Sequence, residues 1–303
     1  MPLRQPNTRL DQTPLCDASE AFTSSSLCGR HHASPLYSGG CYSMNSSLPG
    51  RTGLICSALA ALACAMVATL IIHRFQLDLT LAQWIYALEG HEWTLKEHWL
   101  FSELLHQRGR QLSIALLLLC LILLLASGIH PRLRPYRRVL AYLVISPLIA
   151  SGVILLGKRS LGVECPWSLQ PFGGDVPYSP LLQQLFNHGS GSCFPAGHAS
   201  AGYAWLALYF AAATVQPRWR YAALALALGL GLLFGTTQQL RGAHFLSHDI
   251  WSFTLCWSIN ALLAALMLAP RRDCSLHPDS SMMQLKSVSE RLPNVSDFRS
   301  TGR

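Results

Sequence analysis

The chain has 303 residues, of which 50% are hydrophobic and only 13% are charged. Soluble globular proteins carry about 25% charged residues, so this chain has roughly half the usual share. Its apolar residues are gathered in uncharged blocks of 17 to 19 residues, close to the ~20 residues that cross a bilayer. This pattern excludes an ordinary soluble enzyme, a coiled coil and a disordered chain. The net charge of +8 is therefore interpreted first as a signal of membrane topology.

Six blocks without Asp, Glu, Lys or Arg predict six membrane-spanning helices, because a segment inside a bilayer must satisfy its own backbone hydrogen bonds. The predicted fold class is an all-α, six-transmembrane helix bundle. In the fifth block, Gly231 and Gly235 predict close packing against a neighbouring helix. The predicted spans are Leu54–Ile72, Gln111–Ile129, Val139–Gly157, Ala199–Val215, Tyr221–Thr237 and Ile250–Leu268.

Basic residues predict the orientation of the bundle, because cytoplasmic loops collect Lys and Arg. The loops after spans two and four contain arginine and no acid, and two arginines follow span six, which places these three segments and both termini inside. The outer segments are then Arg74–Arg110, Lys158–His198 and Gln238–Asp249. The arginines that fix this orientation are Arg132, Arg134, Arg137, Arg138, Arg218, Arg220, Arg271 and Arg272.

The outer segment Arg74–Arg110 mixes both signs of charge with Trp84, Trp93 and Trp99. This composition predicts an interfacial helical segment with an aromatic belt between the first two spans.

Two polar tails flank the predicted membrane domain of residues 54–268. Residues 1–53 are rich in Ser and predict a disordered cytoplasmic tail, as do residues 269–303. The stretch from Met44 to Arg51, just before the first span, resembles a natural translation start. Two alternatives therefore stay open: translation begins at Met1, or it begins at Met44 and residues 1–43 are an annotation extension.

Ten cysteines are present, but in this topology only Cys165 and Cys193 face outside. Disulfides persist in oxidising compartments, so a Cys165–Cys193 bridge is predicted. The alternative is two free thiols, which non-reducing peptide mapping would detect.

Three groups of chemically active residues fall on the outer face, although none of them was used to assign the topology. Lys158 ends span three, Pro195-Ala196-Gly197-His198 opens span four, and a polar group lies between spans five and six. This last group consists of Arg241, His244, His248 and Asp249. On a helix, His244 and His248 share one face, a spacing that also suits a metal site. The occurrence of all three groups on one face predicts a single site.

The three groups resemble the signature motifs of the type 2 phosphatidic acid phosphatase (PAP2) superfamily of membrane lipid phosphatases. The first motif, Lys-x6-Arg-Pro, corresponds to Lys158 followed by Cys165-Pro166. The second, Pro-Ser-Gly-His, corresponds to residues 195–198 with Ala196 in place of Ser. The third, Ser-Arg-x5-His-x3-Asp, is matched at His244; its Arg position falls on Gln238 and its Asp position on His248. The resemblance covers roughly residues 54–268.

The resemblance implies a phosphatase that uses no cofactor and no metal. His244 would attack phosphorus and form a phosphohistidine, and His198 would protonate the leaving group. Lys158, Arg241 and the backbone N–H groups of Gly197 and His198 would bind the phosphoryl oxygens. A second group must orient His244. Helix spacing favours His248 and family chemistry favours Asp249, so both are retained.

The expected substrate is a lipid phosphate or polyprenyl diphosphate, cleaved at the periplasmic face of a bacterial inner membrane. Three alternatives are retained: a lipid phosphotransferase, a catalytically impaired lipid-phosphate binding protein, and a metal or haem protein that uses His198, His244 and His248. Nucleic-acid binding is not expected, because the basic residues are divided among short loops.

Overall fold

The computed structural model describes residues 47–100, 107–187 and 189–269, and within these ranges the chain is helical and contains no strand. Five helical segments of the described chain are long and apolar enough to cross a membrane. They are Arg51–Phe75, Gly109–Ala126, Arg134–Ser160, Pro217–Leu240 and Leu246–Met267. Five predicted spans therefore correspond to long helices, and the all-α class is confirmed.

The fourth predicted span differs from the others because it is not one regular α-helix. It consists of α6 (Gly197–Tyr203), the 3₁₀ turn η6 (Ala204–Leu206) and α7 (Ala207–Val215). Most of its residues are buried, and they include the wholly enclosed Leu206 and Ala207. It is the interior helix of the bundle, and its status as a sixth crossing stays a prediction.

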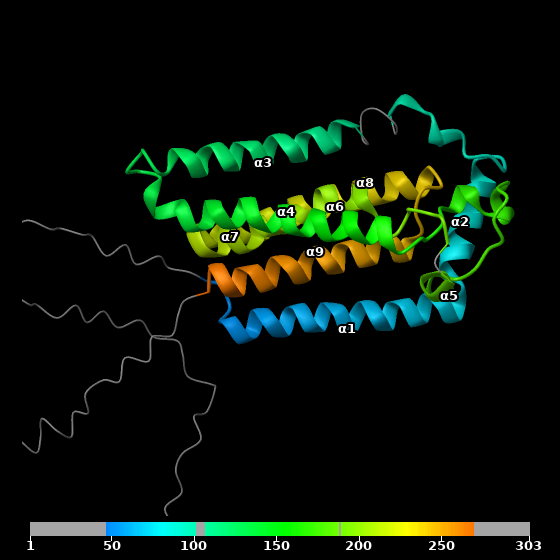
Figure 1. Ribbon diagram of the computed structural model, residues 1–303, viewed down its shortest axis with the longest axis horizontal. Coiled ribbons are helices and arrows are strands. Elements are labelled where there is room, and N and C mark those ends of the chain that lie inside the picture. Colours follow the sequence, from blue (N-terminus) through cyan, green and yellow to red (C-terminus); the bar gives the residue numbers. More distant parts are fainter. Residues whose placement is uncertain (1–46, 101–106, 188, 270–303) are drawn as a thin grey trace, which may run out of the picture. The chain divides into compact units, whose positions relative to one another are not determined.

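The helices pack in an order that brings sequence-distant segments together. The helix α1 (Arg51–Phe75) packs on α9 (Leu246–Met267), which packs on α4 (Arg137–Ser160). The helix α8 (Arg220–Leu240) lies against α6, and α3 (Gly109–Ala126) lies on the outside of α4 and α6. Figure 1 shows these long helices running side by side.

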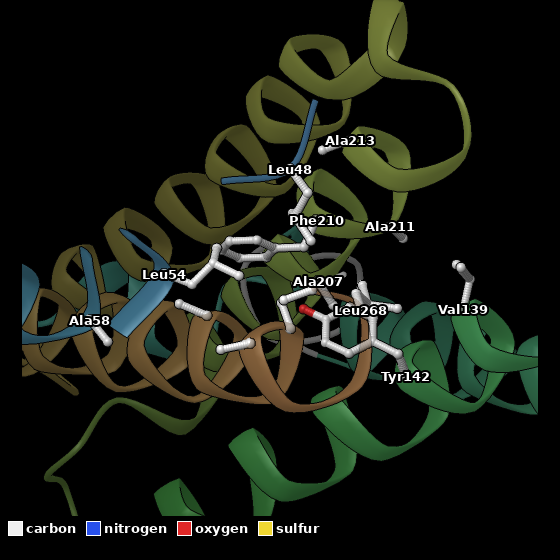
Figure 2. Close-up of a cluster of buried hydrophobic side chains, with 14 residues drawn as sticks. Leu48, Leu54, Ala58, Val139, Tyr142, Ala207, Phe210, Ala211, Ala213 and Leu268 are labelled. Carbon is white, nitrogen blue, oxygen red and sulfur yellow. The ribbon is translucent and has the colours of Figure 1, made fainter. Parts of the chain in front are cut away.

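A core of small and aromatic residues holds α1, α4, α7 and α9 together (Figure 2). Phe210 and Tyr142 are its largest fully buried side chains, with Leu54 between α1 and the interior helix. The core also includes Leu48, although the sequence predicts a disordered tail up to residue 53. The Ser47 N–H donates to the Ala213 carbonyl at 3.0 Å and α1 begins at Arg51, so the last residues of that tail pack on the bundle. Residues 1–46 and 270–303 lie outside the described ranges.

A buried polar network crosses the middle of the bundle. The Tyr142 hydroxyl donates to the Asn260 carbonyl at 3.0 Å, and Ser146 donates to the Asn260 side chain. The Asn260 amide in turn donates to the Ala204 carbonyl at 3.3 Å. The Ala204 carbonyl also accepts from the Ala207 N–H, so Asn260 adds a second bond where the interior helix departs from α-helical geometry.

One end of the bundle carries a cap made of α2 (Leu77–Leu88) and the segment 161–196, which includes η4 (Pro166–Ser168), η5 (Gln170–Phe172) and α5 (Leu181–Asn187). In Figure 1, α2 and α5 lie at the same end. Ala82, Leu169 and Phe172 form a buried cluster with Phe245, the residue next to His244. Trp84 is exposed on α2. The placement of α2 in a membrane interface stays a prediction.

Glycines allow α6 and α8 to touch through their backbones, as expected from Gly231 and Gly235. A Cβ on Gly202 of α6 would lie 2.3 Å from the Gly231 nitrogen, and one on Gly231 would lie 2.1 Å from the Tyr203 ring. The close packing predicted for the fifth span is therefore present.

We expect Gly202→Val to destabilise the bundle by roughly 1–3 kcal/mol, because overpacking forces two backbones apart. The matched control is Gly229→Val on α8, where an added Cβ meets nothing within 4 Å. Thermal unfolding in detergent should show a lower melting temperature only for Gly202→Val. Equal melting temperatures for the two variants would contradict this packing.

Candidate active site

Lys158 lies in the last turn of α4, beside the start of α6. A Cβ on Gly197 would lie 3.2 Å from Lys158 Cδ and 3.7 Å from its Nζ, and one on Gly157 would lie 2.8 Å from Pro195 Cδ. The first and second predicted motifs are therefore packed directly together. This contact places the ammonium group at the N-terminal end of the interior helix, next to His198.

A cavity of about 450 Å³ opens at this junction between α3, α4 and α6. Lys158, His198 and Gly197 line one end of it, together with Arg110 from the start of α3. The rest of its wall is mainly apolar and comes from Ile114, Leu117, Pro147, Leu148, Ile154, Leu155, Ala201 and Trp205, with Ser113, Ser151 and Ser200. The cavity thus has basic and polar side chains at one end and mainly apolar side chains along the rest of its wall.

His244 and His248 are neighbours, but not because they share a helix face as predicted. The helix α9 begins only at Leu246, so His244 belongs to the preceding loop. The Nδ1 atoms of the two rings lie 3.5 Å apart, and both residues are buried. The His248 ring also packs edge-on against Phe194 and Phe245, which fixes its orientation.

The pKa of His244 is lowered well below its ordinary value of 6.5. Burial is the largest cause, and positive charge on three neighbouring groups adds to it, those of His248, Lys158 and His198. A ring in this setting is neutral at physiological pH and retains a nitrogen lone pair. The three charged groups lie on α4, α6 and α9, and two of them, Lys158 and His198, line the cavity, whereas His244 does not.

Asp249, the other predicted partner of His244, faces α8. Gln239 donates a hydrogen bond to its Oδ2. A Cβ on Gly235 would lie 2.8 Å from that same oxygen, so the carboxylate fills the space that this glycine leaves. The contacts of Asp249 are thus with α8, whereas His248 contacts His244.

Arg241 follows α8 and points toward the segment after α2. Its Nε donates to the Lys96 carbonyl at 2.9 Å, and its Nη1 donates to the Gln238 side chain at 3.3 Å. It is not among the described residues that line the cavity. Gln238, which holds the Arg position of the third motif, is itself buried.

Asp78, a buried carboxylate on α2, belongs to none of the motifs recognised in the sequence. Its oxygens accept from the Ser247 N–H at 2.9 Å and from the Ser247 hydroxyl at 2.6 Å, so it caps the first turn of α9 from outside that helix. Burial raises the pKa of Asp78, against the lowering effect of these bonds. The only feature of the sequence that points to this residue is its position, as a single acidic residue shortly after the first predicted span.

The segment 161–196 is closed by a disulfide between Cys165 and Cys193, whose Cα atoms lie 5.3 Å apart. Each half-cystine borders a motif: Cys165 holds the Arg position of the first, and Cys193 lies just before the second. The backbone of Cys193 also forms a hydrogen bond with His244. The presence of the bridge in the purified protein stays a prediction for peptide mapping.

Histidine and acidic side chains at this end do not gather as metal ligands do. Within the described ranges, no group of three or more His, Cys, Asp or Glu side chains has a geometry that could hold a metal ion.

The PAP2 superfamily model matches residues 135–272, which include all of α4, the interior helix, α8 and all of α9. No curated protein and no solved structure shows significant similarity to the chain. The matched region contains Lys158, His198 and His244, the residues that converge on one site. Through residues 135–272, the chain belongs to the PAP2 superfamily.

Proposed function

We propose that this membrane protein removes phosphate from a lipid phosphate or diphosphate through a phosphohistidine on His244. The observation that carries the proposal is one arrangement: His248 contacts His244, and Lys158 packs on Gly197 beside His198 at a cavity with a mainly apolar wall. A phosphoryl group needs cations and a nucleophile at one end of such a site, and its hydrocarbon chain needs the apolar wall.

In the proposed reaction, His244 attacks phosphorus through Nε2, because its Nδ1 faces His248. The N–P bond forms as the P–O bond to the lipid breaks, and protonated His198 gives its proton to the leaving oxygen. Neutral His198 then takes a proton from water, which attacks phosphorus and releases inorganic phosphate and free His244. Lys158 and the Gly197 N–H stabilise the phosphoryl oxygens throughout. Arg241 donates a hydrogen bond to the Gln238 side chain. Its direct contact with the phosphoryl group stays a prediction.

The proposed location is a bacterial inner membrane with the site facing the periplasm. This orientation rests on the arginine-rich loops at the opposite end of the helices. A substrate in the outer leaflet would then enter the cavity laterally.

A second candidate is a lipid-phosphate binding protein with impaired catalysis. Two positions at which the family motifs have arginine favour this candidate, because in this chain neither can supply a guanidinium. They hold the disulfide-bonded Cys165 and the buried Gln238. Lipid phosphotransfer is the same chemistry with a second lipid in place of water.

Purified protein should release inorganic phosphate from at least one member of a panel that contains phosphatidate, phosphatidylglycerol phosphate, a polyprenyl diphosphate and lipid A phosphates. Release should continue in excess chelator and stop with vanadate, which mimics the trigonal phosphoryl group. Phosphate found on a second lipid instead would indicate phosphotransfer. Substrate binding without any transfer would support the binding protein, and loss of activity in chelator would support the metal alternative.

A further inference from the structure

Two helical stripes with the same polarity form the walls of the cavity. On α3, the lining residues Arg110, Ile114 and Leu117 follow helical spacing, and on α4 the lining residues Leu148, Leu155 and Lys158 do so. The two helices run in opposite directions, so the first turn of α3 and the last turn of α4 lie at the same end. Arg110 and Lys158 therefore line the cavity from the same end of the two helices.

The start of α3 is fixed by contacts on either side of Arg110. The ring of Phe234 packs on Gly109 so closely that a Cβ there would lie 2.6 Å from Phe234 Cζ. One turn later, the Trp205 indole N–H donates to the Ser113 hydroxyl at 2.9 Å. Arg110 lies between these two contacts, so its backbone position is defined by α8 and by the interior helix.

Arg110 supplies what the matched family region lacks at this cavity. Of the described residues that line the cavity, Arg110 is the only arginine. The two family arginine positions hold Cys165 and Gln238, and the guanidinium of Arg241 is bonded to Lys96 and Gln238. Arg110 also lies outside residues 135–272, the region that the family model matches.

We propose that Arg110 is a phosphate-binding residue, which completes the site from a helix outside the family domain. Its guanidinium donates a pair of hydrogen bonds to two phosphoryl oxygens while Lys158 binds the third, and the apolar stripes below hold one hydrocarbon chain of the same lipid. This inference rests on the proposed function for its substrate class, but it concerns binding and does not require turnover.

The test compares Arg110→Ala with Arg108→Ala in the full-length protein. Arg108 is the matched control because it is as exposed as Arg110 and lies two residues away, yet donates to Gln111 at 3.1 Å and does not line the cavity. The binding probe is hexadecylphosphonate, a non-hydrolysable lipid phosphate analogue, and thermal unfolding checks that each variant is folded.

We expect Arg110→Ala to weaken phosphonate binding roughly 10- to 100-fold, as for loss of a charge-assisted hydrogen-bonded pair. Arg110→Lys should recover part of the affinity, since it restores charge without the paired geometry. Arg108→Ala should bind within about twofold of the wild type. With a turnover substrate, Arg110→Ala should raise KM more than it lowers kcat.

Equal phosphonate affinity in Arg110→Ala and Arg108→Ala would overturn the inference, as would a wild-type protein that does not bind the phosphonate. Absence of phosphate release by a wild type that binds the phosphonate would overturn the proposed function alone. In that case the Arg110 inference still stands if affinity is lost in Arg110→Ala, and fails if it is retained.

Discussion

His244→Ala is expected to abolish phosphate release, lowering kcat by roughly 10⁴-fold or more, as removal of a covalent nucleophile does in other enzymes. No group left at that position can form the N–P bond. His198 and Lys158 would still bind and polarise the substrate, so KM should change much less than kcat. The measurement is phosphate release by purified variants from the best lipid of the panel.

The matched control is His130→Ala, because His130 is exposed in the loop after α3 and lies at the opposite end of that helix from Arg110. It should retain wild-type turnover. Quenching with detergent at alkaline pH during turnover should trap phosphate on the wild type in a base-stable, acid-labile bond, and the bond should be absent from His244→Ala. Phosphate release by His244→Ala at the wild-type rate would remove His244 as the nucleophile.

The sequence predicts the long helices well because the requirement of a bilayer is local. A run of apolar residues without charge satisfies its backbone only as a helix, so Gly109–Ala126 and Leu246–Met267 lie within a few residues of the predicted spans. The break in the interior helix is different. At this break the Ala204 carbonyl accepts a bond from Asn260, which lies 56 residues further along the chain. No local pattern encodes that pairing.

In the candidate site, too, residues in local motifs are predictable from the sequence, whereas residues brought in by long-range packing are not. Lys158, His198 and His244 are found from motif spacing, because each comes at the end of a helix on the predicted outer face. Arg110 and Asp78 belong to no motif, and they reach the site only through packing of α3 on α4 and of α2 on α9. A basic residue directly before a predicted span has an obvious interpretation as an interface anchor, which conceals a role in the cavity.

The sequence favours His248 as the neighbour of His244, but the two residues meet for a different reason from the predicted one. Helix spacing from 244 to 248 favours His248, but the helix begins at Leu246. The two rings meet because the Gly242–Phe245 loop turns into α9, with the His248 N–H donating to the Phe245 carbonyl at 3.1 Å. The loop itself is held by Trp167, whose N–H donates to the Gly242 carbonyl at 3.0 Å. The cap thus helps to position His244, the proposed nucleophile.

The second large effect is expected at His248. A neutral histidine attacks through one nitrogen only if a partner fixes the tautomer at the other, and loss of such a partner costs up to about 10⁴-fold in kcat in a well-studied hydrolase. His248→Leu removes the partner but keeps most of the buried volume, so kcat should fall roughly 10²- to 10⁴-fold with little change in KM. Asp249→Asn, which preserves shape beside Gln239, should stay within about tenfold of the wild type.

His248→Asp separates orientation from packing. It places a carboxylate at the position where the third family motif has its Asp, and a carboxylate can accept the His244 Nδ1–H as an imidazole can. We therefore expect His248→Asp to exceed His248→Leu in kcat by at least about tenfold, although it fits the pocket between Phe194 and Phe245 less well than leucine. If Asp249→Asn loses activity while His248→Leu retains it, Asp249 orients the nucleophile and its contact with Gln239 must change when substrate binds. If His248→Asp recovers activity, this chain performs the task of the family carboxylate with an imidazole at the same position.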